Sequence, residues 1–117
     1  SGFDGYCIYY YGNENSTVNV KNSTFATVGK GICIYSESAK AYNLNVDKCS
    51  FTSSDSATDK AAIQMHTELG ITGNVKITET TATDFADING GLWNELNNNT
   101  KVATDKFDIW VDGTQVH

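Results

Sequence analysis

Short stretches of alternating hydrophobic and polar residues recur along the chain, separated by glycine, asparagine, serine and lysine. The stretch GYCIY at residues 5–9 returns as GICIY at residues 31–35. A second stretch, VNVKNSTF at residues 18–25, returns as LNVDKCSF at residues 44–51, shifted by the same 26 residues. Because an alternation with a period of two is typical of half-buried strands, each copy is predicted to be strand, turn and strand rather than helix.

Two weaker copies follow at a longer spacing, which is consistent with insertions in loops. The third copy is AAIQM at residues 61–65 with VKITETTA at residues 75–82, and the fourth is GGLWN at residues 90–94 with FDIWV at residues 107–111. We therefore divide a single domain, residues 1–117, into four repeats: residues 5–30, 31–60, 61–89 and 90–117.

The alternation also predicts which side chains face the core. In the second strand of each repeat, the apolar positions are expected to point inward and the polar positions outward. The inward positions are Val18, Val20, Leu44, Val46, Val75, Ile77, Ile109 and Val111, and the outward positions are Asn19, Asn45, Lys76 and Trp110.

In the first strand of each repeat, a single glutamine decides the assignment, because glutamine favours the outer face. The column of Gln64, which also holds Ile8, Ile34 and Trp93, is therefore expected to point outward. The columns on either side of it are expected to point inward: Cys7, Cys33, Ile63 and Leu92 in one, and Tyr9, Tyr35, Met65 and Asn94 in the other.

A unit of about 26 residues cannot bury its own apolar face and must stack on its neighbours. Stacked parallel strands lie about 4.8 Å apart and place like residues above one another, so Cys7 is expected above Cys33 and Phe25 above Phe51. Parallel neighbours are poorly oriented for a disulfide. We therefore expect all three cysteines, including Cys49, to be free buried thiols.

These repeats resemble the right-handed parallel β-helix of the pectate-lyase-like superfamily. The likeness is carried by the paired GxCIY stretches and by the two stretches that end in Phe25 and Phe51, and it covers residues 5 to about 82. It implies an all-β fold, a right-handed single-stranded parallel β-helix (solenoid) of about four coils. A likeness between repeats speaks to the fold and says little about activity.

Two segments also fit helical structure. Residues 58–70 begin with Thr58 and Asp59 as candidate N-caps, continue with good helix formers and end at Gly70. The repeat register predicts a strand there instead, and we favour the strand. The stretch from Leu92 to Leu96 is open to the same alternative, as one helical turn.

The two ends of the chain differ. The repeats begin by residue 5 with no cap ahead of them, which would expose the strand edges of the first coil. We therefore expect the chain to be the C-terminal part of a longer β-helix, with Ser1 and Gly2 left from cloning, or else to form a homodimer through that open N-terminal coil. Residues 107–116 contain an Asp-Gly pair and are predicted to form a C-terminal hairpin that caps the last coil.

Composition and charge exclude several partners. The chain has eight lysines, no arginine and 14 acidic residues, and its net charge of −6 argues against binding to nucleic acid or anionic membranes. No apolar run approaches the roughly 20 residues of a membrane span, so no membrane insertion is expected. A composition rich in asparagine, serine and threonine, with lysine as its only strong base, is typical of secreted or cell-surface bacterial proteins.

Catalysis receives little support from the side chains. The resemblance implies calcium-binding acids on one sheet and a basic residue, commonly arginine, that abstracts a proton. The chain contains no arginine, and its outward strand positions carry no ladder of acids. Asp84 and Asp87 lie in one loop and could hold a calcium ion, the single cofactor that we consider, although solvated loop acids are the simpler interpretation. Whether the chain is an enzyme stays uncertain, and a non-enzyme is favoured.

Binding is the more open class of function. Aromatic side chains beside asparagine are a common arrangement for stacking on sugars, and the candidates are Tyr6, Tyr10, Tyr11, Trp93 and Trp110. The alternative is that both tryptophans cover the last coil as part of the cap. We expect a non-catalytic, surface-exposed module for adhesion, for recognition of a glycan or another cell-surface ligand, or for use as a stalk. The alternative function is a fragment of a polysaccharide lyase or glycoside hydrolase.

Overall fold

The computed structural model describes residues 6–11, 16–27, 30–36, 38–53 and 60–117. Across these residues the protein is all-β, and its strands lie in three sheets with mostly parallel pairing. Helical structure there is limited to one 3-10 turn, η1 (Asn89–Gly91). No helix in this part of the chain is long and apolar enough to cross a membrane.

The three sheets are named A, B and C, and their strands are given in spatial order. Sheet A contains β1 (Tyr6–Tyr10), β4 (Lys30–Ile34), β7 (Ile63–His66), β10 (Trp93–Asn97) and β11 (Val102–Ala103). Sheet B contains β13 (Thr114–Gln115), β12 (Phe107–Val111), β8 (Thr72–Thr78), β5 (Ala41–Asp47) and β2 (Ser16–Lys21). Sheet C contains β3 (Thr24–Thr27), β6 (Ser50–Ser53) and β9 (Thr81–Thr83).

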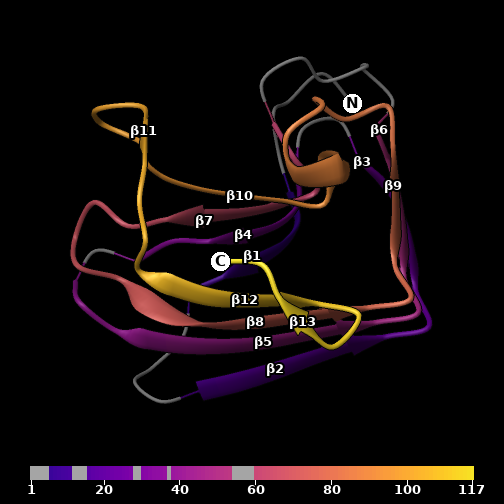
Figure 1. Cartoon of the computed structure of the whole chain (residues 1–117), viewed down its shortest axis with the longest axis horizontal. Coiled ribbons are helices and arrows are strands. Elements are labelled where there is room, and N and C mark those ends of the chain that lie inside the picture. Colours follow the sequence, from indigo (N-terminus) through magenta and orange to yellow (C-terminus); the bar gives the residue numbers. More distant parts are fainter. Residues whose placement is uncertain (1–5, 12–15, 28–29, 37, 54–59) are drawn as a thin grey trace.

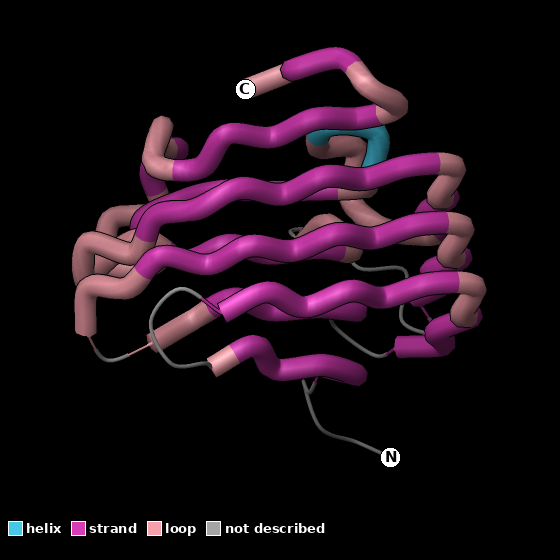
Figure 2. Tube along the Cα trace, turned by 90° about the horizontal axis from the view of Figure 1, so that it is seen from below, coloured by secondary structure: helices cyan, strands magenta, loops and turns pink. Residues whose placement is uncertain are grey.

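The chain visits sheets A, B and C in turn and then returns beside its own preceding strand. Each strand of the second and third repeats pairs in parallel with the equivalent strand of the repeat before it. Figure 1 shows the sheets as three sides around a common core, and Figure 2 shows the strands of successive repeats lying one above another. Two antiparallel pairs, β10 with β11 and β12 with β13, complete the C-terminal edge.

In sheets B and C the predicted register is confirmed. Asn19, Asn45, Lys76 and Trp110 follow one another across sheet B. The apolar residues directly before and after each of these four in the sequence point into the core. In sheet C, Phe25 lies on Phe51 with the two ring centroids 4.9 Å apart and the ring planes 11° from parallel. The inward faces of these two sheets therefore form the stacked core that the alternation predicts.

In sheet A the predicted faces are wrong for three of the four repeats. Strand β4 pairs with β1 two residues out of the expected register, so Tyr9 rather than Cys7 lies opposite Cys33. The inward columns are Ile8, Ile32, Ile63 and Trp93, and then Tyr10, Ile34, Met65 and Glu95; the outward column is Tyr9, Cys33, Gln64 and Asn94. Only Ile63, Met65 and Gln64 were assigned correctly.

The reason for the error is that β4 is apolar on both faces. Alternation of polar and apolar residues cannot show whether Cys33 or its two isoleucine neighbours face the core. Directing both isoleucines inward places more apolar surface in the core than directing Cys33 inward. Cys33 and Cys49 are free and buried, as expected, although Cys33 lies on the outer side of the sheet. The side chain of Cys7 lies outside the described residues.

The two helical alternatives are also settled by the structure. Residues 63–66 form strand β7, so the prediction from the repeat register is confirmed, and Thr58 and Asp59 lie outside the described residues. The stretch from Leu92 to Leu96 is mostly strand β10, and the 3-10 turn η1 ends just before it.

The turn that follows the long strand of sheet B has the same backbone shape in each repeat, and in the first three repeats it leads to sheet C. One residue there adopts a left-handed conformation, with φ between 47° and 54°, and its backbone N–H donates to a carbonyl of the next repeat in the first two cases (both 2.9 Å). These corner residues are Asn22, Lys48, Glu79 and Asp112. In the last repeat Asp112 continues into Gly113, whose φ is also positive (86°), and the two form the predicted hairpin turn between β12 and β13.

Glu95 places a carboxylate at the end of an apolar core column. It is only 2 % exposed and lies in the last parallel strand of sheet A. The backbone N–H of Phe107 donates to one carboxylate oxygen, and the other accepts from the N–H of Lys106 (3.2 Å) and the hydroxyl of Thr104 (2.8 Å). A buried carboxylate needs such donors, so Glu95 fixes the segment that crosses from sheet A to sheet B.

His117 extends this cluster from the C-terminal side. Its Nε2 lies 3.1 Å from Glu95 Oε2 and 2.8 Å from the carbonyl oxygen of Thr104, and its ring lies 5.1 Å from the ring of Trp93. In Figure 1 the C-terminus lies between sheets A and B. Burial alone would lower the pKa of His117, but the hydrogen bonds to Glu95 and Thr104 and the charges of Glu95 and Asp105 outweigh it and raise the pKa above 6.5.

Replacing Val46 with aspartate is expected to unfold the protein. Val46 is buried between Val20 and Ile77 in sheet B, so the new carboxylate would be unpaired in the core. That penalty of several kcal/mol is comparable to the roughly 5–15 kcal/mol total stability of a domain. Asn45→Asp adds the same charge one residue away on the outer face and should change stability by less than about 1 kcal/mol. Thermal melts followed by circular dichroism compare the two; a Val46→Asp protein that melts like wild type would contradict the inward assignment.

The His117 contacts predict a pH-dependent stability difference between wild type and His117→Gln. Because the folded pKa is raised, the contribution of His117 is fully present below its unfolded pKa of 6.5 and is lost as the pH rises through the folded pKa. Wild type should exceed the variant by up to about 1 kcal/mol near pH 5.5 and lose that advantage by pH 9. Urea unfolding of both proteins at these pH values measures the difference, and His66 cancels because both proteins contain it. An advantage that grows toward pH 9 would refute the assignment.

Candidate functional site

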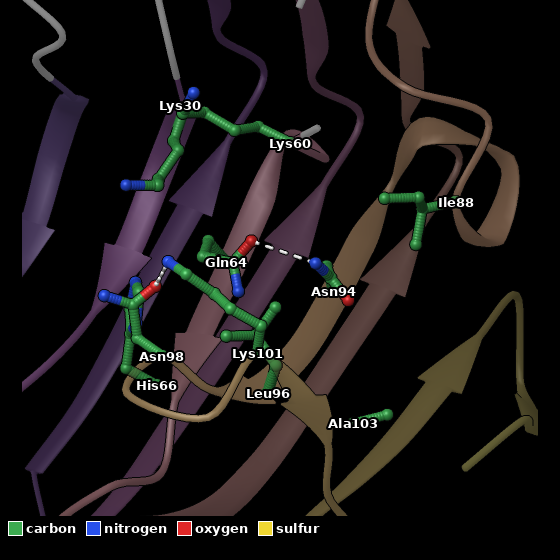
Figure 3. Close-up of a pocket in the computed structure, with 10 residues that line it drawn as sticks. All are labelled: Lys30, Lys60, Gln64, His66, Ile88, Asn94, Leu96, Asn98, Lys101 and Ala103. Carbon is green, nitrogen blue, oxygen red and sulfur yellow. Dashed lines mark hydrogen bonds between the residues drawn. The ribbon is translucent and has the colours of Figure 1, made fainter. Parts of the chain in front are cut away.

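The outer side of sheet A carries a groove that crosses its strands. Its larger part is a hollow of about 430 Å³ and its smaller part a hollow of about 310 Å³. The two share Lys30, His66 and Asn98, so we treat them as one feature, the sheet A groove. Figure 1 shows η1 and β11 projecting from this side of the sheet, and Figure 3 shows the residues that line the larger hollow.

Side-chain amides lie at the centre of the groove. Gln64 and Asn94 are neighbours across β7 and β10, and Asn94 Nδ2 donates to Gln64 Oε1 at 3.3 Å (Figure 3). Gln64 Nε2 also donates to the carbonyl of Met65 at 3.4 Å. Amides both donate and accept hydrogen bonds, so this strip can contact hydroxyl or carboxylate groups of a ligand.

The turn between β10 and β11 forms one wall of the groove. The side chain of Asn97 caps it by accepting from the N–H groups of Asn99 (3.0 Å) and Thr100 (3.3 Å). The backbone N–H of Asn98 donates to Glu68 Oε2 at 3.3 Å, which fastens the turn to the segment after β7. Lys101 Nζ donates to Asn98 Oδ1 at 2.8 Å, so the lysine points along the groove (Figure 3).

Three of the eight lysines line the larger hollow, although the chain carries a net charge of −6. They are Lys30, Lys60 and Lys101, and they come from the first, second and fourth repeats. Among the described lining residues of both hollows, Glu68 is the single acid. Among the described lining residues, three ammonium groups stand against one carboxylate, a balance that attracts anionic ligands.

His66 lies where the two hollows meet and is 7 % exposed. Within the described part of the chain its Nδ1 has no hydrogen-bond partner, and the nearest carboxylate oxygen, on Glu68, is 3.8 Å away. Burial lowers the pKa of His66 to about 4, and the positive charges of Lys30 and Lys101 add to that effect while Glu68 opposes it. The imidazole is therefore neutral at physiological pH and contributes a polar, uncharged surface.

Cys33 lies in the smaller hollow with His66 and Glu68, a combination that invites comparison with a cysteine nucleophile. Burial raises the pKa of the Cys33 thiol to about 12, although Lys30 acts in the opposite direction. Only the thiolate is nucleophilic, so this thiol is inert at neutral pH. The groove is better suited to noncovalent binding than to covalent catalysis.

A row of aromatic rings borders the smaller hollow. The rings of Tyr9 and Tyr35 stack with centroids 6.3 Å apart, Tyr11 lies 6.0 Å from Tyr9, and His66 meets Tyr35 edge-on at 5.8 Å. Tyr11, predicted from the sequence as a binding residue, is 49 % exposed. Tyr9 and Tyr35 were expected in the core, and the altered register of sheet A explains why they lie on its outer side instead.

The outward positions expected for Tyr10 and Trp93 are wrong. Tyr10 is 4 % exposed, packs edge-on against Tyr42 and shares a hydrogen bond of 2.7 Å with Ser16 Oγ. Trp93 is 8 % exposed and belongs to the core beneath His117. Trp110 does point outward, from sheet B, and the side chain of Tyr6 lies outside the described residues.

The loop acids Asp84 and Asp87 are both exposed. In the described residues no group of three or more histidine, cysteine, aspartate or glutamate side chains is arranged to hold a metal ion. The calcium hypothesis therefore has no further carboxylate, histidine or cysteine ligand among the described residues and stays a prediction.

The groove lysines were missed by reasoning from the sequence, although a signal for two of them exists. Lys30 and Lys60 each stand directly before the first strand motif of a repeat, at GICIY and AAIQM. The structural register pairs Ile32 with Ile63, so the two lysines lie one position apart along the stacked strands and not directly one above the other. Lys101 has no such signal, because it lies in a turn outside the repeated pattern.

Comparison with known proteins found no match that could assign a function to this groove. No protein-family model matches the chain, and neither the curated proteins nor the solved structures include a match. The sheet A groove, with its lysines, amides and tyrosines, is therefore the basis for the function proposed below.

Proposed function

We propose that the protein is a non-catalytic recognition module of the bacterial cell surface or secreted space that binds an acidic polysaccharide in the sheet A groove. We further propose that its three sheets of mostly parallel strands form a right-handed parallel β-helix of about four coils, of the pectate-lyase-like type. The stacking of equivalent strands in sheets A, B and C supports that finer description.

The observation that carries the proposal is the gathering of three lysines, a strip of amides and a row of tyrosines in one groove. These residues come from all four repeats, from Tyr9 in the first to Asn94 in the fourth. A groove that crosses neighbouring strands suits an extended chain better than a compact small molecule.

Each kind of side chain has a separate role in such a complex. The ammonium groups of the lysines attract carboxylate or sulfate groups. The amides of Gln64 and Asn94 exchange hydrogen bonds with sugar hydroxyls. The faces of Tyr9 and Tyr11 offer apolar surface to the C–H face of a sugar ring. Together they favour a polymer that is both anionic and rich in hydroxyl groups.

The same residues support binding without turnover. Glycoside hydrolysis commonly needs two carboxyl groups on either side of the scissile bond, whereas the described groove residues include only Glu68. The Cys33 thiol is protonated and His66 is neutral, so neither carries the charge that nucleophilic or acid chemistry would use. No specific observation among the described groove residues favours the alternative function, a polysaccharide lyase or glycoside hydrolase.

Reversing the charge of Lys101 is expected to weaken binding of an acidic oligosaccharide by about tenfold, because it replaces attraction with repulsion inside the groove. Oligogalacturonate and heparin-derived oligosaccharides are suitable probes, with affinity measured by calorimetry at low and at physiological salt. Lys21→Glu is the matched control, since it changes the net charge equally but lies in sheet B. Affinity should fall for both proteins as salt rises, and more steeply for wild type than for Lys101→Glu.

Three results would contradict the proposal. Equal loss of affinity in the Lys101→Glu and Lys21→Glu proteins would show that binding follows net charge and not the groove. Release of unsaturated or shortened sugars during incubation would show catalysis and favour the lyase or hydrolase. Failure to bind any acidic probe would leave a structural spacer as the better interpretation.

A further inference from the structure

Sheet B carries a second binding feature on a different side of the molecule from the groove (Figure 1). Trp110 points outward from β12, and Lys76 precedes it in the same column on β8. Asn45 and Asn19 continue that column across β5 and β2. The result is a flat polar face with one large aromatic side chain near its C-terminal edge.

The indole is held in place by its neighbours. Lys76 Nζ lies over the ring, 5.5 Å from the centroid, at a distance that suits a cation–π interaction. The backbone of β12 is paired on both sides, with β8 and with β13, so the ring is mounted on a rigid element and not on a loop. A rigid aromatic surface loses little conformational entropy when a ligand stacks on it.

Two hollows flank the pair formed by Trp110 and Lys76. The larger is about 380 Å³ and the smaller about 360 Å³, and both residues line both hollows. The larger hollow is otherwise lined by Thr17, Asn43, Asn45 and Asn74, and the smaller by Ile77, Thr78 and Gly113. The larger one therefore combines an aromatic wall with a lining of hydroxyl and amide groups.

Hydrogen bonds along the sheet orient those amides. Asn45 Nδ2 donates to Asn19 Oδ1 at 2.9 Å, and Asn74 Nδ2 donates to Asn43 Oδ1 at 3.1 Å. Each bond engages the NH₂ group, and in the described part of the chain neither Asn45 Oδ1 nor Asn74 Oδ1 accepts a hydrogen bond. Both oxygens are therefore available to hydroxyl groups of a ligand.

We propose that this face is a second carbohydrate site, which binds one pyranose ring of a neutral glycan. The ring stacks its C–H face on the indole of Trp110 and donates hydroxyl hydrogens to the side-chain oxygens of Asn45 and Asn74. This site lies on another sheet and takes another class of sugar than the sheet A groove.

The charges of the face favour a neutral sugar. The ammonium of Lys76 already lies over the indole, and Asp108 stands exposed beside Asn74 in the next strand. Asp108 lies next to Asn74, which lines the larger hollow, and its negative charge offsets that of Lys76, so the face lacks the excess of lysines that distinguishes the groove. The lysines of the groove thus favour an acidic sugar, and the balanced charges of the sheet B face favour a neutral one.

The test is binding of neutral hexasaccharides to the whole chain, with cellohexaose, mannohexaose, xylohexaose, maltohexaose and N-acetylchitohexaose as probes. Calorimetry should detect binding of at least one, and Trp110→Ala should weaken that binding by about tenfold or more. Asn74→Ala should weaken it severalfold, and Trp110→Phe, which keeps an aromatic face, should retain most of the affinity. Lys101→Glu is the control from the groove and should leave the affinity for neutral sugars unchanged.

Each other outcome overturns the proposal. No binding of any neutral probe would do so, as would binding that survives both Trp110→Ala and Asn74→Ala. Circular dichroism checks that the variants are folded, and if Trp110→Ala is not, Asn74→Ala and Trp110→Phe decide the question. Because the probes and the control variant differ from those for acidic glycans, a failure here is distinguishable from a failure of the groove proposal.

Discussion

The parallel pairing of one repeat with the next is the interaction on which the rest of this structure depends. The strands of sheets A, B and C are between two and seven residues long, too short to hold together alone. A repeat gains a buried inner face only when another repeat lies against it. The left-handed corner residues support that pairing, since the N–H groups of Asn22 and Lys48 each donate to the following repeat. Register in sheets B and C follows from this regular corner.

In sheet A the spacing between equivalent residues is irregular, and this is where reasoning from the sequence failed. Equivalent inward residues there are 24, 31 and 30 positions apart, from Ile8 to Ile32, Ile63 and Trp93. Repeat matching could predict the stack, the hairpin and the outward position of Trp110, because in sheet B polar and apolar residues alternate cleanly. It could not choose a face for β4, where Cys33 stands between two isoleucines and both sides of the strand are buried.

The candidate site depends on features that repeat patterns do not contain. Lys30 and Lys60 each stand directly before a first-strand motif, so the sequence could have indicated two of the groove cations, although the structural register sets them one position apart. Lys101 could not be found in this way, because its position depends on a turn closed by Asn97 and fastened to Glu68. The buried Glu95 was equally hidden, since an acid within an apolar column makes sense only once Lys106 and Phe107 are seen to donate to it.

The contrast between the two outer faces follows from the connections that border each sheet. The short corner after sheet B leaves its outer face flat, and a flat face offers a single ring such as Trp110 with the amides beside it. Most of the connections that border sheet A are longer, and together with the turn between β10 and β11 they place Ile88 and Lys101 at the edges of a hollow. Insertions at that border enlarge the groove without disturbing the stacked core, because they add no residue to any strand. Variation in loop length between repeats is therefore the physical means by which this scaffold acquires a groove on one side and keeps a platform on the other.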